Sequence, residues 1–506
     1  MDVLVVALYL RFVCAVFAVD LSHIETFVQE NRYCLKQRYR PLYHISAAHA
    51  WTNHPSAFVY YKRQYHIFYQ YHPYNGAWGP ISWGHVVSDN LVDWTFYPPA
   101  LIPGELYDKH GCLSGSAIAH NGYLVLFYTG NAVSENATLQ TQNVAISTDG
   151  IVFQKYIYNP VVRDGAFGAE DSRNPKVWRF RNVWYMLLTN TREGVGRLLL
   201  YTSMDLFNWK LNGTLALSLG DTGYAWESPD LIEIDGQHVL MLCLQGVPSD
   251  GFRFKNLYQT GYIVTNFNYV NGQFDDLEVS TATFTELDHG HDFYAPKTVL
   301  AVDGRRLLIG WLGMWESHFK ESKHGWASML TIVREMKLTP QGRLQMPPVR
   351  EVAELRTEIL EDAWYNPGEA FYAGTRTFEL IVSTAKVFYD VAVIFEWDGD
   401  QQYTVGYSAD RGHIIVDRGG VDGLRRADWA PNDKLKLRIF VDYSSIEVFC
   451  GSGDVVFSSR VYPKKNIRVK ISGESQLHVV QYKLRRSVGY DSKLRKYLKE
   501  HVLERA

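Results

Sequence analysis

Short hydrophobic runs separated by turn-forming residues make up most of the chain. From about residue 46 onward, runs such as Phe58–Tyr61 and Val183–Leu188 are rich in β-branched and aromatic residues, with Gly, Asn, Asp or Pro between them. Helical periodicity is confined to Leu21–Arg38 and Asp491–Glu504. The pattern therefore predicts an all-β protein with helices only near its two ends.

A short motif recurs along the first part of the chain. Ser88–Trp94 is echoed by Ser203–Trp209, with a weaker copy, Ser147–Phe153, between them, and the copies begin 59 and 56 residues apart. A unit of that length holds about four short strands, as in one blade of a β-propeller. Residues 43–346 have room for five such units, which predicts a five-bladed β-propeller. Unrelated Asp-x-x-Trp turns are the simpler alternative.

The character of the chain changes after Pro347-Pro348. Residues 349–362 are interpreted as a charged helix or linker, after which alternating strands return from Thr377 to Tyr482. Alternation with turns at this spacing is typical of two packed antiparallel sheets. We therefore expect a β-sandwich over residues 370–485.

Composition narrows the class of partner. The 506 residues carry 51 Lys and Arg against 54 Asp and Glu, a net charge of −3, so no charge excess indicates a nucleic-acid or membrane partner. The chain holds 33 Tyr, 25 Phe and 14 Trp. Aromatic side chains favour strands, and in clefts they stack on flat ligands such as sugar rings.

The N-terminal segment predicts secretion. The apolar run from Val3 to Val19 is short for a membrane span, contains Arg11 and ends in a small-x-small pattern, which together favour a cleaved signal peptide at residues 1–18. A buried or membrane-anchoring helix is the alternative. Sequons at Asn136 and Asn212 fit secretion. The five cysteines lack a C-x-x-C pair and indicate neither a zinc site nor a disulfide scaffold.

Candidate chemistry gathers where innermost propeller strands are expected to begin, since these strands converge on the central channel. Most of these clusters place a polar or ionisable side chain among aromatic ones, a combination that suits a sugar. The clusters are Trp51–Pro55, Leu113–Ser116, Glu170–Pro175, Trp226–Asp230 and Asp292–Pro296.

The order and spacing of these clusters resemble glycoside hydrolase family 32, the β-fructofuranosidases, which include invertases, sucrose-6-phosphate hydrolases and fructan hydrolases. The resemblance covers about residues 43–483 and implies a five-bladed β-propeller followed by a β-sandwich. It also implies a small sugar, sucrose or a related β-fructoside, as partner, with no metal and no other cofactor. Collinear matches include Phe68–Tyr71, Trp83–His85, Pro98–Leu101, Gly111–Ser116, Tyr128–Asn131, Gln259–Tyr262, His324–Trp326 and Arg460–Pro463.

The family's reaction is a retaining hydrolysis, which needs a carboxylate nucleophile and a carboxylic general acid about 5–5.5 Å apart. The resemblance gives the acid role to Glu227, because Trp-Glu-Ser-Pro-Asp is similar to the family's Trp-Glu-Cys-Pro-Asp. That role requires a raised pKa. A third family carboxylate, in Arg-Asp-Pro, stabilises the transition state.

Two of the three catalytic carboxylates are replaced. The family's Trp-Met-Asn-Asp-Pro-Asn-Gly reads Trp-Thr-Asn-His-Pro-Ser-Ala here, so His54 stands at the nucleophile position, and Arg-Asp-Pro has become Arg173-Asn174-Pro175. A protonated imidazole would repel the oxocarbenium-like transition state that a carboxylate stabilises. Asn174 keeps one acceptor oxygen but loses the charge. The remaining family sugar contacts are expected at Asn53, Gln70, Trp78, Ser116, Arg173 and Trp311.

Several interpretations stay open. The chain is a β-fructofuranosidase with strongly reduced or absent turnover, or a non-catalytic sugar- or protein-binding member of the same fold. A ligand-free structural or storage protein is the third possibility. Another carboxylate could act as nucleophile, with Asp108, Asp171, Asp288 and Asp292 as candidates, although Asp171 and Asn174 would face opposite ways on an extended strand. An inverting reaction with water activated by His54 is a further alternative, and the oligomeric state is left open.

Overall fold

The computed structural model describes residues 38–503 except 48–49, 75, 134–137, 164–170, 386–388, 432–433 and 490. The predicted signal peptide and nearly all of the predicted helix at residues 21–38 lie outside the described residues. At the other end, α3 (Ser492–Leu498) and a π-helical turn (Lys499–Leu503) confirm the predicted C-terminal helix. Within the described part of the chain, no helix is long and apolar enough to cross a membrane.

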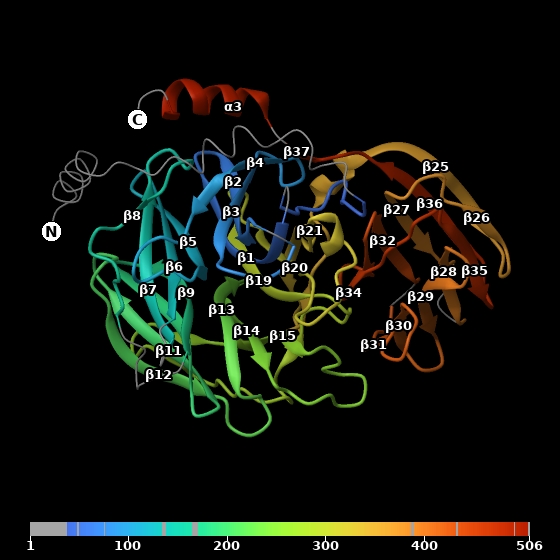
Figure 1. Ribbon diagram of the computed structural model, residues 1–506. Coiled ribbons are helices and arrows are strands. Elements are labelled where there is room, and N and C mark those ends of the chain that lie inside the picture. The colour runs from blue at the N-terminus through green and yellow to red at the C-terminus, as the bar shows by residue number, and fades with distance from the viewer. Residues whose placement is uncertain are drawn as a thin grey trace.

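Five four-stranded units are arranged radially and form the predicted five-bladed β-propeller (Figure 1). The blades are β1 (Ala50–Tyr61), β2 (Gln64–His72), β3 (Ser82–Ser88) and β4 (Trp94–Leu101); β5 (Cys112–His120), β6 (Tyr123–Val133), β7 (Thr138–Ser147) and β8 (Gln154–Lys155); β9 (Asp171–Phe180), β10 (Val183–Arg192), β11 (Val195–Ser203) and β12 (Lys210–Leu217); β13 (Ala225–Ile234), β14 (Gln237–Gln245), β15 (Tyr258–Thr265) and β18 (Thr285–Glu286); and β19 (Tyr294–Leu300), β20 (Arg306–Leu312), β23 (Arg334–Leu338) and β24 (Leu344–Gln345).

Short strands complete the first and last blades. β21 (Trp326–Ala327) pairs in parallel with β1, and β37 (Val488–Gly489), from the C-terminal end, pairs in parallel with β4. β22 (Met329–Leu330) adds to β20, while β16 (Phe267–Asn268) and β17 (Gln273–Phe274) form a separate hairpin. The innermost strands β1, β5, β9, β13 and β19 surround the channel.

The recurring motif is one turn used three times. In each copy the side-chain oxygen of the third residue, Asn90, Asp149 or Asp205, accepts backbone N–H groups two and three residues further on. The indoles of Trp94 and Trp209 then donate to the carbonyl three residues back. These Asx turns join the third and fourth strands of the first three blades, so the sequence period is confirmed as a blade period.

A β-sandwich of two six-stranded antiparallel sheets follows the propeller (Figure 1). After a 3-10 helix, η3 (Arg350–Leu355), residues 356–365 form a strand, which corrects the helix or linker expected there. One sheet holds β25 (Arg356–Tyr365), β36 (Leu477–Leu484), β27 (Phe378–Ser383), β32 (Lys436–Asp442), β33 (Ser445–Cys450) and β34 (Val455–Arg460). The other holds β26 (Ala370–Tyr372), β35 (Arg468–Gly473), β28 (Val391–Trp397), β29 (Gln401–Ser408), β30 (His413–Asp417) and β31 (Leu424–Asp428).

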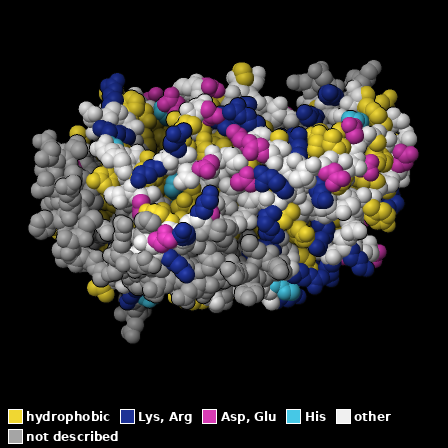
Figure 2. Space-filling view, turned by 90° about the horizontal axis from the view of Figure 1, so that it is seen from above, with side chains coloured by type: hydrophobic (Ala, Val, Ile, Leu, Met, Phe, Trp, Pro, Cys, Tyr) yellow, Lys and Arg dark blue, Asp and Glu magenta, His cyan; other side chains and the backbone are white. Residues whose placement is uncertain are grey.

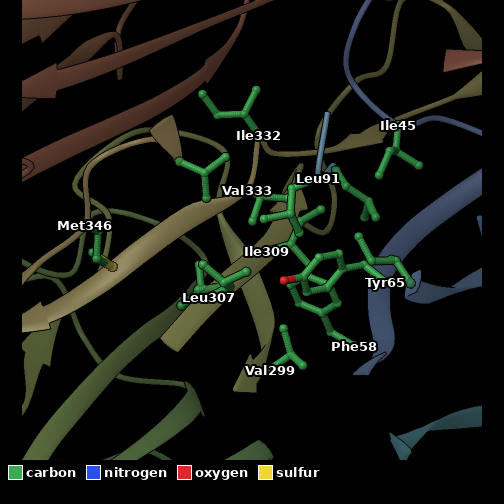
Figure 3. Packing of buried hydrophobic residues seen from close by; sticks show 14 of the residues in the cluster. Ile45, Phe58, Tyr65, Leu91, Val299, Leu307, Ile309, Ile332, Val333 and Met346 are labelled. Atoms are coloured by element: carbon green, nitrogen blue, oxygen red, sulfur yellow. The ribbon is translucent and has the colours of Figure 1, made fainter. Parts of the chain in front are cut away.

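The two bodies share a packed seam. One hydrophobic cluster unites Phe58 of the first blade, Ile309 of the last and Val349 of the connection, and it extends to Phe440 and Phe449 of the sandwich. Figure 3 shows part of this cluster, with Phe58 and Tyr65 facing Ile309. Burial of this continuous apolar surface holds the sandwich against the propeller.

Buried charges cross the same seam. His44 lies between two carboxylates, with Nδ1 2.8 Å from Asp442 and Nε2 2.9 Å from Glu447. Arg334 joins Glu447, at 2.7 Å, to Asp288, at 2.9 Å. Burial lowers the pKa of His44, but the two carboxylates raise it more, to about 9, so the imidazole is a cation at neutral pH.

We expect stability to fall at alkaline pH through His44. Its folded-state pKa of about 9 exceeds the unfolded value, so its contribution is complete below pH 6.5 and is lost as the pH rises through 9. The shift corresponds to about 3 kcal/mol. Urea unfolding should therefore show that the difference in free energy of unfolding between the parent and His44→Gln shrinks by about that amount from pH 6 to pH 10. A gap independent of pH would contradict this.

Candidate active site

Each innermost strand is interrupted by a register shift against its neighbour. In β1, β5, β13 and β19 the shifts fall between Thr52 and Pro55, Leu113 and Gly115, Glu227 and Asp230, and Tyr294 and Lys297. In β9 the shift lies at Asn174 and Pro175, opposite Leu188. A bulge re-aims the side chains beside it. The five bulges lie at or beside His54, Ser114, Asn174, Glu227 and Tyr294. A β-bulge therefore occurs in each of the five clusters that the sequence indicated.

Three bulges use a left-handed backbone at a residue other than glycine. Asn174 has a φ of 65°, Ser228 of 48° and Ala295 of 46°. Asn tolerates this conformation comparatively well, whereas Ser and Ala adopt it at a cost that the surrounding structure has to offset. Such strain is typical of functional sites.

Glu227 is held by two donors. Its Oε1 lies 2.9 Å from Nε of Arg173, and its Oε2 accepts a hydrogen bond from the Tyr294 hydroxyl at 2.6 Å. Burial raises the pKa of Glu227, but Arg173, His54 and the hydrogen bonds outweigh it, so the pKa lies below its ordinary value. Glu227 is therefore ionised at neutral pH, which is opposite to the protonated state that a general acid requires.

His54 is a neutral imidazole in a largely aromatic recess. Its Nδ1 lies 3.1 Å from Oγ of Ser114, and its ring lies 6.1 Å from the Tyr294 ring and 6.3 Å from the ring of Trp311. Burial, together with Lys297 and Arg173, lowers the pKa of His54 to about 4, although Glu227 acts in the opposite direction. The repulsion expected from a protonated His54 is thus absent at neutral pH, yet no negative charge is supplied either.

The missing charges explain the state of Glu227. Two carboxylates at positions 54 and 174 would disfavour a third ionised carboxylate near them, and like-charge repulsion of this kind raises the pKa of a general acid. Here both positions are uncharged, so the attraction of the Arg173 guanidinium prevails. The groups around Glu227 thus favour its ionised form.

Unpartnered polar atoms gather on the innermost strands. Among buried side-chain atoms without a hydrogen-bond partner are Nε1 of Trp51, both amide atoms of Asn53, Nδ2 of Asn174, Oγ of Ser228 and Nζ of Lys297. Buried polar groups are normally satisfied, so a concentration of unmet donors and acceptors indicates a place for a polar ligand or ordered water. Asn53 and Asn174 were predicted here from sequence.

Lysines and one carboxylate line another part of the channel. Lys176 on β9 lies 2.6 Å from Asp230 on β13, whose other carboxylate oxygen accepts the Thr298 hydroxyl at 2.9 Å. Lys297 on β19 is 2% exposed, and its burial, partly opposed by Asp230, lowers the pKa of its ammonium to about 8. Lys176 is thus paired with Asp230, whereas Nζ of Lys297 has no hydrogen-bond partner.

Three of the four alternative carboxylates are engaged elsewhere. Asp108 accepts the Tyr128 hydroxyl at 2.9 Å and lies 2.6 Å from Lys155 of the second blade. Asp288 and Asp292 lie in the seam. The first is bound to Arg334 at 2.9 Å and the second to Arg418 at 2.8 Å.

Asp171 is different. Its carboxylate lies 2.8 Å from Nη2 of Arg173, whose Nε binds Glu227. Both carboxylates thus share one guanidinium. The bulge at Asn174 interrupts the strand alternation from which opposite facing of Asp171 and Asn174 was predicted.

The other four predicted contact residues differ in their surroundings. Gln70 donates to Ser114 at 2.8 Å and so positions the hydroxyl beside His54. Ser116 is engaged with backbone: its hydroxyl donates to the Pro175 carbonyl at 2.8 Å, which ties β5 to β9. Trp311 is completely buried behind His54, whereas Trp78 is 55% exposed in the loop between β2 and β3 and is not packed around His54.

Several side chains at this site had no assigned role in the sequence interpretation. Tyr294 and Ser114 lie within quoted motifs, so the signal for them was present. Trp315 and Phe319 pack near Trp51 and Trp311. The sequence contained no signal for these two residues, because they belong to an irregular loop. Within the described residues no group of His, Cys, Asp and Glu could hold a metal ion.

Comparison with known proteins gives a consistent result. Residues 44–348 match the Glycosyl hydrolases family 32 N-terminal domain, and residues 372–485 match the Glycosyl hydrolases family 32 C terminal region. The sucrose-6-phosphate hydrolase of Escherichia coli is 34% identical over 450 residues, covering 85% of this chain and 90% of that enzyme.

Solved structures agree with this assignment. The Bombyx mori GH32 β-fructofuranosidase BmSUC1 has a TM-score of 0.85 and 39% identity, covering 92% of this chain and 98% of that chain. An aspartate-to-alanine mutant of the same Bombyx mori enzyme, in complex with sucrose, has a TM-score of 0.86 and covers 93% of this chain. With both family regions matched and relatives above 30% identity over most of its length, the chain belongs to glycoside hydrolase family 32.

Proposed function

We propose that this chain binds sucrose or a related β-fructoside in the propeller pocket and hydrolyses it only very slowly. Its relatives include sucrose-6-phosphate hydrolases and a β-fructofuranosidase. The Bombyx mori enzyme binds sucrose even when one of its aspartates is replaced by alanine. This complex supports the proposal that a family member lacking an aspartate can still bind the sugar.

One observation supports the proposal: His54, at the position that the family resemblance assigns to the nucleophile, is neutral and hydrogen-bonded to Ser114, and Glu227 is ionised beside Arg173. A retaining reaction needs a negative charge at the anomeric carbon and a proton for the leaving oxygen. This pocket supplies neither at neutral pH.

An inverting reaction is also disfavoured. His54 could position water, but an imidazole with a pKa of about 4 is a weak base. Protonated Glu227 would still be needed at the leaving group, and its lowered pKa confines that form to acid solution. Any residual hydrolysis should therefore rise as the pH falls.

A non-catalytic sugar-binding protein is the second candidate. It is favoured by the unpartnered polar atoms of Trp51, Asn53 and Asn174 on the innermost strands. Sugar hydroxyls both donate and accept hydrogen bonds, so a bound fructoside would satisfy amide groups of this kind.

Calorimetric titration with sucrose and a glucose-release assay separate the candidates. We expect binding that is weakened at least about fivefold by Asn53→Ala, since a buried pair of hydrogen bonds is lost. Measurable hydrolysis that Glu227→Gln abolishes would identify a slow enzyme, whereas hydrolysis that is undetectable in both proteins would identify a binding protein. Absence of sucrose binding would contradict the proposal.

We also propose that the protein is secreted after cleavage of residues 1–18 and that residues 43–346 and 370–485 are its two domains. The apolar run from Val3 to Val19 and its small-x-small ending support secretion. N-terminal sequencing of protein collected from the culture medium should then begin near Val19. Retention in the cell with Met1 intact would contradict it.

A further inference from the structure

Two cavities open along the seam between propeller and sandwich. The first, about 630 Å³ and called the seam cavity here, is lined by Asp292, residues 317–320, Trp397, residues 400–402, residues 418–420 and residues 460–462. The second, about 490 Å³ and called the comparison cavity, lies between Arg343, Arg426 and their neighbours. Both have the size of small-molecule sites.

The seam cavity contains buried donors with nothing to bind. Among its lining residues, Nε1 of Trp397 and Nη1 of Arg460 are buried and lack hydrogen-bond partners. Trp397 is 6% exposed and Arg460 is 4% exposed. Neither atom can accept a hydrogen bond, so a ligand that satisfies them must bring acceptors. The described residues of the comparison cavity contain no such atom.

Most charged groups of the seam cavity are already paired. Asp292 is occupied, because its Oδ2 accepts from Arg418 at 2.8 Å and from the Arg460 backbone at 2.8 Å. Arg460 also binds Glu321 through Nη2 at 2.6 Å, which leaves Nη1 unused. Lys320 is exposed, and its ammonium stands 5.2 Å from the centre of the Tyr462 ring. The exposed Asp400 is the one lining carboxylate that opposes a bound anion.

We propose that the seam cavity binds a small oxyanion, the phosphate or carboxylate group of a metabolite, through Trp397, Arg460 and Lys320. Guanidinium and ammonium groups form short charge-assisted bonds to such oxygens, and an indole N–H adds a fixed donor. Figure 2 shows Lys and Arg interspersed with Asp and Glu on the face that it presents, so that face carries no broad basic patch.

The seam cavity also adjoins the sugar pocket. Phe319 lines the cavity, and its ring lies 5.4 Å from the Trp51 ring and 6.2 Å from the Trp311 ring. An anion in the cavity would thus stand one aromatic ring away from the wall behind His54. The oxyanion site is nevertheless separate from the sugar site and does not depend on the function proposed above.

Titration of the full chain with inorganic phosphate, followed by calorimetry and phosphorus NMR, tests the site. One phosphate should bind per chain. Lys320→Gln, which changes an exposed side chain, and Trp397→Phe, which keeps an aromatic ring and removes the N–H, should each weaken binding about fivefold or more. The matched control, Arg343→Gln in the comparison cavity, should leave the affinity unchanged.

Three results would overturn the proposal: no phosphate binding at tens of millimolar, binding that neither Lys320→Gln nor Trp397→Phe weakens, or equal weakening by Arg343→Gln. Parallel titrations with acetate and fructose identify the preferred group. If acetate displaces bound phosphate and fructose does not, the site accepts a carboxylate as well as a phosphate group, which agrees with the proposal. Equally tight binding of uncharged fructose would show a neutral sugar site and contradict it.

Discussion

The double variant His54→Asp/Asn174→Asp is expected to hydrolyse sucrose about a thousandfold or more faster than the parent chain, because loss of a nucleophile in a well-studied protease lowers turnover about a millionfold. An aspartate at position 54 would restore the attacking carboxylate, and one at position 174 would restore the charge that stabilises the transition state. Both would also raise the pKa of Glu227, which Arg173 now keeps low. The measurement is kcat/KM for sucrose.

The pH profile supplies an independent check. In the parent, the acid form of Glu227 disappears as the pH rises above its lowered pKa, so residual activity belongs to acid solution. In the double variant the acid form should persist to higher pH, and the optimum should shift upward. His54→Asn/Asn174→Asp is the matched control, because it replaces the imidazole without placing a charge at position 54, and it should gain little.

Ordinary turnover by the parent chain would contradict the proposed slow hydrolysis. If the parent reached about 1–10³ s⁻¹, a carboxylate from elsewhere would have to act. Asp171 is the candidate, since it shares the Arg173 guanidinium with Glu227. Asp171→Asn would then abolish hydrolysis, whereas under the present proposal it should leave the double variant active.

Replacing Glu447 by Gln should lower the free energy of unfolding by about 3–5 kcal/mol, because removing one partner from a buried ion network leaves uncompensated charge. Glu447 is buried and contacts His44 at 2.9 Å, Arg334 at 2.7 Å and the Ile332 backbone N–H at 2.9 Å. The neutral amide of glutamine would leave the cations of His44 and Arg334 without the negative charge that Glu447 supplies. Urea denaturation at pH 7 measures the loss.

Glu379→Gln is the matched control. Glu379 is also buried and binds two arginines, Arg356 and Arg438, each at 2.7 Å. Its partners are partly exposed, so water can solvate them after the change, and the expected loss is about 1–2 kcal/mol. Equal losses in the two variants would show that the seam network contributes no special stability.

Sequence periodicity was sufficient to predict the architecture. The Asx turn repeated at Asn90, Asp149 and Asp205 is a local structure, so it could be recognised without knowledge of tertiary contacts. Residues 356–365 were not recognised as a strand, because a charged, exposed edge strand lacks the apolar alternation that marks a buried one. The predicted propeller and sandwich were nevertheless confirmed.

The functional site was only partly predictable. Ser116 is a motif residue, but its hydroxyl is bound to the neighbouring blade. Trp315 and Phe319 pack near His54 and Trp311 from a loop whose path no periodicity determines. Asp171 and Arg173 lie two residues apart in regular register and therefore share one strand face, as alternation predicts. That Arg173 also binds Glu227 of the next blade is a tertiary contact, which strand alternation cannot anticipate.

The sequence by itself determined which chemical groups stand at the three positions that the family resemblance marks as catalytic: an imidazole, an amide and one carboxylate. Only the tertiary structure decided their charge states, because a pKa depends on burial and on neighbours brought from other strands. Arg173 from one blade and Tyr294 from another keep Glu227 ionised, and burial keeps His54 neutral. The fold places these residues around one channel, and that placement sets the electrostatics of the pocket.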